Sequence, residues 1–185
     1  KDNIFLEWLN PNNRKKFTWL ETKLNILKIS KTLKKIIKEG DRCLLVSENR
    51  PEWFISDLAI MQANGITVPA YTTYTEEDYK YLIEDCKPSV VFISNYEIFK
   101  KLKKTIEEKV FIKKVIIFDK LDNLDKNKYL YFDSIIKEDV NIYDESEIVK
   151  LKRNSIACII YTSGTGGNPK GVILSHGGIL NNLVG

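Results

Sequence analysis

Hydrophobic positions along the chain follow two spacings, one typical of strands and one typical of helices. Short apolar runs predict strands at 42–47, 66–70, 89–93 and 115–118. Around them, apolar residues recur every three or four positions and predict helices that begin near Thr18, Pro51, Thr75 and Tyr96. Because strand and helix alternate with short connections, we expect right-handed β-α-β units, a mostly parallel sheet and an α/β fold of stacked layers.

Polar residues and glycines mark the ends of these helices. Thr18 and Glu21 have the spacing of a capping box, and Thr75 with Asp78 has a weaker form of it. Gly40 suits the left-handed position after the first helix. Residues 1–16 carry little signal, so no element is predicted there.

Residues 119–154 break the alternation. They are charged, contain the aromatic run Tyr129–Phe132 and predict a short helix near 144–150. We interpret 119–154 as a crossing segment between two subdomains, the first an α/β unit at 1–150 and the second beginning at 151–185. In the second, apolar runs predict two strands within 156–174, and Ser175 is predicted to cap a final helix.

The loop between these two strands is rich in glycine and hydroxyl residues. Glycine lets a backbone approach a ligand closely, and amides, hydroxyls and an ammonium together suit a polyphosphate. An ordinary turn is the competing interpretation. Neither the Walker nor the dinucleotide pattern fits, because Lys170 lies between Pro169 and Gly171, and Pro169 stands where the third glycine would be. The stretch reads Tyr161-Thr162-Ser163-Gly164-Thr165-Gly166-Gly167-Asn168-Pro169-Lys170-Gly171.

This stretch resembles the phosphate-loop signature of the AMP-forming adenylate ligases, which include acyl-CoA synthetases, luciferases and peptide-synthetase adenylation domains. The family pattern is aromatic-Thr-Ser-Gly-Ser/Thr-Thr-Gly-x-Pro-Lys-Gly-Val, followed by Ser/Thr-His. The chain matches it from Tyr161 to Val172 and again at Ser175-His176. Gly166 departs from the pattern, which has Thr or sometimes Ser there. That departure keeps open a second hypothesis, a non-catalytic binding module of the same fold that has lost tight ATP binding.

Three earlier stretches, 40–42, 47–53 and 68–73, resemble the early region of acyl-CoA synthetases, and the last is most like the long-chain fatty acyl members. The resemblance covers nearly the whole chain and implies the large N-terminal domain of the adenylate-forming fold. It implies an ATP-dependent ligase that converts a long-chain fatty acid to acyl-AMP and then to acyl-CoA, with ATP, Mg²⁺ and CoA. Adenylation of another carboxylic acid stays open as the alternative.

Site residues follow from the same resemblance. Lys170 is the candidate catalytic residue, a point cation for the phosphates. No metal ligand is predicted. His176, the only histidine, and the run Glu48–Arg50 are interpreted as structural, at a helix start and a strand-to-helix turn. The candidate ATP-binding residues are Thr162, Ser163, Gly164, Thr165, Gly166, Gly167 and Lys170.

Composition narrows the classes of function. The 185 residues carry a net charge of +4 from lysines spread along the chain, without the clustering or module of a nucleic-acid binder. Cys43, Cys86 and Cys158 lie far apart, which argues against a disulfide framework or zinc site and for core thiols in a reducing compartment. No apolar run approaches the ~18–20 residues of a membrane span.

We therefore expect a cytoplasmic protein whose partners are the small molecules fatty acid, ATP and CoA, with no nucleic acid. Peripheral contact with an intracellular membrane and the oligomeric state stay open. Because Lys1 is not a methionine and the last helical pattern still runs at Gly185, we expect a fragment, or a processed or trimmed chain. The resemblance implies that it is an N-terminal fragment. The chain alone is expected to be inactive, because it would supply the phosphate-binding loop and not the complete active site.

Overall fold

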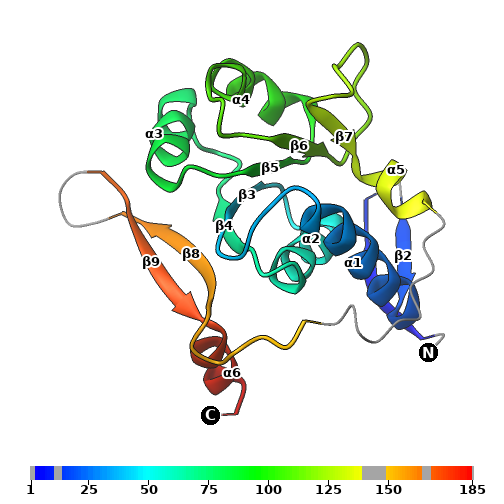
Figure 1. The fold of residues 1–185 in the computed structure, drawn as a ribbon. Helices are drawn as coiled ribbons and strands as arrows, with labels where there is room; N and C mark the ends of the chain where they lie inside the picture. Colours follow the sequence, from blue (N-terminus) through cyan, green and yellow to red (C-terminus); the bar gives the residue numbers. More distant parts are fainter. Residues whose placement is uncertain (1–2, 11–13, 139–148, 164–167, 185) are drawn as a thin grey trace.

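The computed structural model describes residues 3–10, 14–138, 149–163 and 168–184. Most of its strands form one seven-stranded sheet with the order β7-β6-β5-β3-β4-β8-β9. Neighbouring strands are parallel except β8 and β9. The predicted α/β fold with a mostly parallel sheet is therefore confirmed (Figure 1). The strands are β3 (Arg42–Val46), β4 (Ile66–Ala70), β5 (Val90–Ile93), β6 (Lys114–Ile117), β7 (Tyr129–Tyr131), β8 (Ile156–Thr162) and β9 (Lys170–Ser175).

Helices cover both faces of the central strands. Successive side chains of a strand point to opposite faces. Leu44 and Val46 therefore pack with α3 and α4, while Cys43 and Leu45 pack with α1, α2 and α5 (Figure 1). Burial on both faces explains why these strands appear in the sequence as continuous apolar runs. The helices are α1 (Trp19–Lys34), α2 (Pro51–Gln62), α3 (Glu76–Cys86), α4 (Tyr96–Glu108), α5 (Phe132–Lys137) and α6 (His176–Val184).

The predicted caps at the helix N-termini are confirmed. Thr18 Oγ1 accepts a hydrogen bond from the Glu21 amide at 3.2 Å, and Glu21 Oε2 accepts one from the Thr18 amide at 2.8 Å. Thr75 and Asp78 form the same reciprocal pair at the start of α3. Each cap contributes about 1 kcal/mol. Gly40 has the predicted left-handed conformation, with φ +80°. However, α1 already ends at Lys34 with Lys35 as its C-cap, so Gly40 lies in the turn before β3 and the prediction that it caps the helix is wrong.

An N-terminal hairpin lies in the region where no element was predicted. Strands β1 (Ile4–Trp8) and β2 (Lys15–Thr18) form a separate antiparallel two-stranded sheet. Phe5 stacks on Trp19 with ring centroids 3.6 Å apart, and Lys15 Nζ forms an ion pair with Glu52 Oε1 at 2.7 Å. The hairpin thus depends on contacts with α1 and α2, which the local sequence pattern does not reveal.

Residues 129–137 differ from the expected crossing segment. Strand β7 pairs in parallel with β6 and extends the sheet, and α5 buries Phe132 and Ile135. Tyr129 and Phe132 of the aromatic run are therefore part of the core. Most of the short helix expected near 144–150 lies outside the described residues. The division at residue 150 stays a prediction, and β8 joins the main sheet through its pairing with β4.

None of the helices in the described part of the chain combines the length and apolar character needed to cross a membrane.

Candidate phosphate-binding site

The glycine-rich loop joins β8 to β9 at the carboxyl-end edge of the parallel strands. The two strands pair antiparallel, and Thr162 opposite Lys170 is the pair nearest the loop. In Figure 1 this hairpin lies at one edge of the sheet, with its loop end toward α3. Open α/β sheets bind ligands outside the carboxyl ends of their strands. The candidates Gly164, Thr165, Gly166 and Gly167 lie outside the described residues.

Thr162 and Lys170 share one side of the hairpin. Residues directly opposite each other in an antiparallel pair project to the same side, and both side chains are exposed, as is Ser163. Lys170 forms no ion pair with any described residue. The structure thus brings a hydroxyl and an exposed ammonium together beside the loop, which suits an anionic phosphate group.

Tyr161 faces the other side of β8. Its side chain is 5% exposed and belongs to the core cluster of α3 and α4. Its phenol donates a hydrogen bond to the Asp85 carboxylate of α3. Burial, reinforced by this bond, raises the pKa of Tyr161 above its usual value. The phenol is therefore protonated at neutral pH and acts as a donor.

Gly171 is a glycine for a reason of packing. It lies opposite Tyr161 in the ladder. A Cβ at this position would lie 2.7 Å from Ile159 Cγ2 and 3.4 Å from Tyr161 Cζ. The side chains of Ile159 and Tyr161 occupy the space above Gly171. Because Gly171 has no Cβ, β8 and β9 can pair closely at the residue next to Lys170.

His176 begins α6. The predicted cap is confirmed, because the Gly178 amide donates to Ser175 Oγ at 3.1 Å. Burial lowers the pKa of the His176 imidazole, which favours its neutral form. The His176 amide donates to the Ser155 carbonyl at 3.0 Å. These contacts favour the structural interpretation of this histidine.

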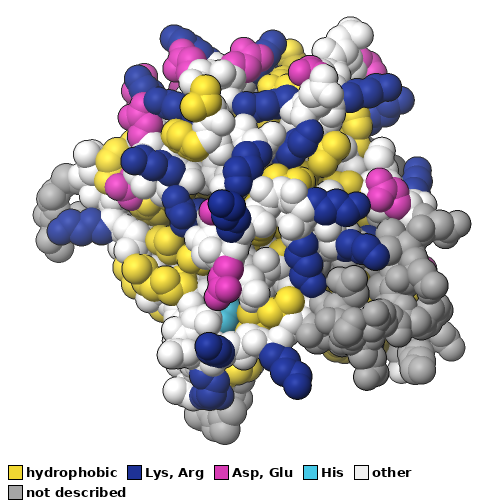
Figure 2. All heavy atoms as spheres, viewed as in Figure 1, with side chains coloured by type: hydrophobic (Ala, Val, Ile, Leu, Met, Phe, Trp, Pro, Cys, Tyr) yellow, Lys and Arg dark blue, Asp and Glu magenta, His cyan; other side chains and the backbone are white. Residues whose placement is uncertain are grey.

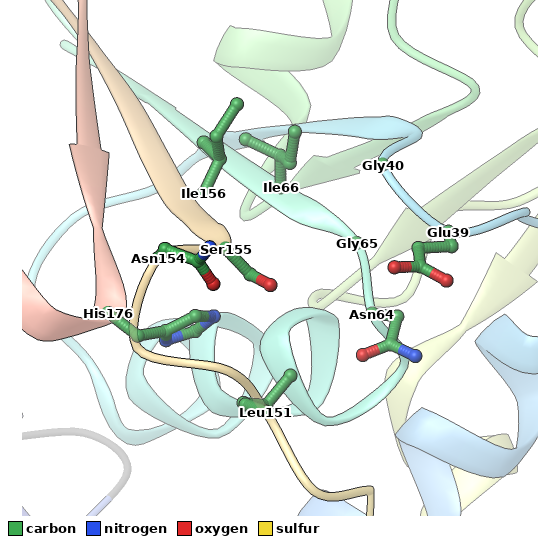
Figure 3. Close-up of a pocket in the computed structure, with 10 residues that line it drawn as sticks. All are labelled: Glu39, Gly40, Asn64, Gly65, Ile66, Leu151, Asn154, Ser155, Ile156 and His176. Atoms are coloured by element: carbon green, nitrogen blue, oxygen red, sulfur yellow. The ribbon is translucent and has the colours of Figure 1, made fainter.

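A small pocket of about 220 Å³ lies beside His176. Figure 3 shows Asn154 and His176 on one side of it and Glu39 and Asn64 on the other. Its lining includes Ile66 and Ile156, the first residues of β4 and β8. The pocket therefore lies at the amino ends of these strands, at the opposite edge from the loop.

A larger groove of about 670 Å³ runs between α2, β4, β8 and α6. Most of its lining is apolar, including Met61, Ile160 and Ile179. Burial raises the pKa of the Asp57 carboxyl, which also lines it. Arg153 and His176 also line this groove, but its mostly apolar surface and the Asp57 carboxyl suit a polyphosphate less well than the exposed hydroxyls and ammonium beside the loop.

Arg50 is a second cation at the carboxyl-end edge, directly before α2. Its guanidinium donates to Glu52 Oε2 at 2.9 Å and to Asp119 Oδ1 at 3.0 Å. It also lies over the Trp8 ring, with 4.5 Å from Cζ to the ring centroid. These contacts support the interpretation of Glu48–Arg50 as structural and add a buried ionic network that the sequence did not suggest.

Metal and thiol chemistry has little support in the described residues. Within them, no group of three or more His, Cys, Asp or Glu side chains could hold a metal ion. Cys43, Cys86 and Cys158 are buried free thiols, as predicted. Burial raises the pKa of Cys86 to about 12, so this thiol stays protonated and inert at neutral pH.

Charge is dispersed on the face of the molecule seen in Figure 2. On the face shown in Figure 2, Lys and Arg side chains are scattered from top to bottom and are mixed with Asp and Glu at the upper end. A nucleic-acid footprint would need these cations gathered on one patch or stripe. This face gives no support for nucleic-acid binding.

Comparisons with known proteins give a matching family model, related sequences and related structures. A family model described as AMP-binding enzyme matches residues 1–185. The chain is similar to the long-chain-fatty-acid–CoA ligase ACSBG2 of Gallus gallus, with 32% identity over 148 residues. The match covers 78% of this chain and spans 19% of that relative's length.

Solved structures of adenylate-forming enzymes share the fold. Acetoacetyl-CoA synthetase from Streptomyces lividans has a TM-score of 0.80 and 19% identity, covering 93% of this chain and 27% of that one. The fatty acyl-adenylate ligase from L. pneumophila, solved with acyl adenylate and pyrophosphate, has a TM-score of 0.69 and 24% identity. That match covers 98% of this chain and 29% of the other. At these identities the likeness establishes the fold alone.

Proposed function

Because the chain belongs to the AMP-binding enzyme family, we propose that it is the ATP phosphate-binding part of an AMP-forming ligase that activates a long-chain fatty acid. The observation that carries the proposal is that Lys170 is exposed, lies opposite Thr162 where the two strands meet the glycine-rich loop, and forms no ion pair within the described part of the chain. The similarity to a long-chain-fatty-acid–CoA ligase supports the class of substrate. Since the chain spans 19% of that relative, the rest of the site would come from other parts of the full-length protein.

The proposed reaction has two steps. A carboxylate oxygen of the fatty acid attacks the α-phosphorus of ATP, the bond to the bridging oxygen breaks, and pyrophosphate leaves as acyl-AMP forms. The CoA thiol then attacks the acyl carbonyl, AMP leaves, and the thiol proton passes to solvent. The product is acyl-CoA.

The chain's own residues act on the phosphates. Lys170 and the hydroxyls of Thr162 and Ser163 hold the β- and γ-phosphates, together with backbone amides of the loop. Holding the leaving pyrophosphate in place and offsetting its charge lowers the barrier by positioning and electrostatics. Mg²⁺, bound with the triphosphate, would supply further positive charge. No described acidic cluster forms a separate protein site for it.

Gly166 supports a second candidate function, a binding module of the same fold that does not hold ATP tightly. A glycine there removes a hydroxyl that the family pattern supplies, and one hydrogen bond to a charged group contributes about 1.5–3 kcal/mol. Restoring the hydroxyl with Gly166→Thr tests how much affinity for ATP it controls.

The deciding experiment is pyrophosphate exchange into ATP by the full-length protein, with palmitate, an aryl acid and amino acids as alternative substrates. The proposal expects exchange that requires the long-chain acid and a lower KM for ATP in Gly166→Thr. Exchange with an aryl or amino acid instead would move the substrate to that class. A folded protein that neither exchanges pyrophosphate nor gains thermal stability from ATP with Mg²⁺ would be the binding module.

A further inference from the structure

The ladder pairing of β8 with the rest of the sheet lies near the start of that strand. Strand β8 pairs with β4 at Cys158 and Thr67. The segment from Ile159 to Thr162 lies beyond this pair, and among the described strands its ladder partner is β9, an edge strand. An isolated two-stranded hairpin is only marginally stable in water. Contacts beyond the two-stranded ladder therefore help to hold the residues on either side of the loop in place.

Helix α3 makes that contact through two side chains. Tyr81 and Asp85 are four residues apart, so they lie on one face of the helix. The Tyr81 phenol donates to the Pro169 carbonyl at 3.0 Å. The Asp85 carboxylate accepts the hydrogen bond from the Tyr161 phenol. The Tyr81 bond thus holds the residue that precedes β9, which we call the β9 arm of the hairpin. The Asp85 bond holds β8, the β8 arm.

Both bonds end beside residues of the phosphate site. Tyr161 directly precedes Thr162, and Pro169 directly precedes Lys170. Fixing these two points therefore fixes the backbone from which the Thr162 hydroxyl and the Lys170 ammonium project. The two hydrogen bonds from α3 therefore hold the hairpin on both sides of the loop, next to Thr162 and Lys170.

Few packed side chains surround the hydrogen bond between Tyr81 and Pro169. A cavity of about 270 Å³ lies between α3 and the loop, lined by Tyr74, Tyr81, Asn168 and Pro169 among others. Side chains that line a cavity have lost packing partners on that side. The position of Pro169 relative to α3 therefore depends strongly on the single hydrogen bond from Tyr81.

We propose that Tyr81, Asp85 and Tyr161 are positioning residues that clamp the phosphate loop to α3. Their effect on nucleotide binding rests on the proposed function, whereas the clamp itself does not. Positioning matters because a small displacement of a phosphate-holding group is costly even when the group itself is intact. None of the three residues needs to touch ATP.

The test uses Tyr81→Phe and Tyr161→Phe in the full-length protein, each removing one hydroxyl and keeping the ring. Tyr131→Phe is the matched control, because the Tyr131 phenol donates to the Leu121 carbonyl at the opposite end of the sheet. We expect amide hydrogen exchange in peptides spanning 161–172 to quicken about tenfold in the two test variants and to stay unchanged in the control. We also expect the KM for ATP to rise about three- to tenfold while kcat changes less.

Asp85 offers a conservative rescue. Asp85→Asn keeps an oxygen that accepts from Tyr161 and should retain most of the protection, whereas Asp85→Ala should lose it. Wild-type exchange rates in both tyrosine variants would overturn the clamp. Faster exchange with a KM for ATP no higher than that of Tyr131→Phe would overturn its positioning role. If the parent protein activates no acid, the proposed function fails, and the exchange rates still decide the clamp.

Discussion

Two cations stand at the carboxyl-end edge of the same sheet in opposite surroundings. The side chain of Arg50 is 3% exposed and forms ion pairs with Glu52 and Asp119. Lys170 is exposed and forms no ion pair with any described residue. The charge of Arg50 is already neutralised inside the protein, whereas the charge of Lys170 is open to an incoming anion.

The difference shows how one edge of a sheet can serve both stability and binding. The planar fork of an arginine suits fixed pairing with buried carboxylates and stacking on an aromatic ring, here Trp8. A lysine is a flexible, strongly hydrated point charge, which suits an exposed site that meets phosphate. Loss of Arg50 should therefore act on folding, and loss of Lys170 on nucleotide chemistry.

The largest effect is expected from Arg50→Met. Among the described residues, this change leaves Glu52, which is 1% exposed, with Lys15 as its one ionic partner. Removing one partner of a buried pair costs about 3–5 kcal/mol of unfolding free energy. Urea unfolding followed by circular dichroism measures it.

Arg14→Met is the control, since Arg14 forms an exposed pair with Glu7 and should cost at most about 1 kcal/mol. The double variant Arg50→Met/Glu52→Leu should recover most of the loss, because no buried charge is left unpaired. A cost for Arg50→Met no greater than that of Arg14→Met would show that the network contributes nothing special.

Lys170→Ala should have the next largest effect, but on activity. We expect kcat/KM for pyrophosphate exchange to fall about 10²–10³-fold, the usual loss for a group that stabilises developing charge. The unfolding free energy should change by less than about 0.5 kcal/mol, because the side chain is exposed. Lys103→Ala, an exposed lysine of α4, is the matched control. Equal activity in the two variants would remove Lys170 from the site.

The two cations also differ in how far the sequence predicts them. The motif around Lys170 is contiguous, so the hairpin that carries it could be predicted, as could the buried strands from their apolar runs. The role of Lys170 in phosphate binding stays a prediction. The partners of Arg50 are far away in sequence. Asp119 lies 69 residues from it, and Lys15 lies 37 residues from Glu52. No local pattern indicates that these side chains meet.

The same limit applies to the clamp on the loop. Tyr161 and Asp85 are 76 residues apart. Nothing in the local sequence of α3 indicates that Tyr81 and Asp85 form hydrogen bonds with the hairpin. The N-terminal hairpin was missed because its short strands are stabilised by α1 and α2 and not by their own pattern. Strand β7 was missed because three residues are too few to show a period.

Acid should weaken the Arg50 network. Burial alone would raise the pKa of Glu52, but hydrogen bonds from Arg50 and Lys15 outweigh it, and the pKa is lowered. A carboxyl whose folded pKa is lowered stabilises the fold above its unfolded pKa, about 4.3. That stability is lost as the pH falls through the folded pKa.

Urea midpoints measured between about pH 6 and about pH 3 should therefore fall more steeply in the wild type than in Arg50→Met/Glu52→Leu. Other carboxyl groups with lowered pKa values, such as Asp41 and Glu21, are common to both proteins and cancel in the comparison. Parallel pH profiles would mean that Glu52 does not lose a stabilising charge on acidification.

The smallest effect is expected from Thr162→Val, which sharpens the assignment of Lys170. Valine keeps the shape and strand preference of threonine and removes one hydroxyl beside the loop. We expect the KM for ATP to rise about fivefold, the effect of losing one hydrogen bond, with the unfolding free energy unchanged.

Since Thr162 and Lys170 project from the same side of the hairpin, both should contact the same phosphates. Their effects on kcat/KM should then be less than additive in the double variant, because groups that share one ligand are coupled. Full additivity would mean that the two side chains act on separate groups, and the shared phosphate site would have to be abandoned.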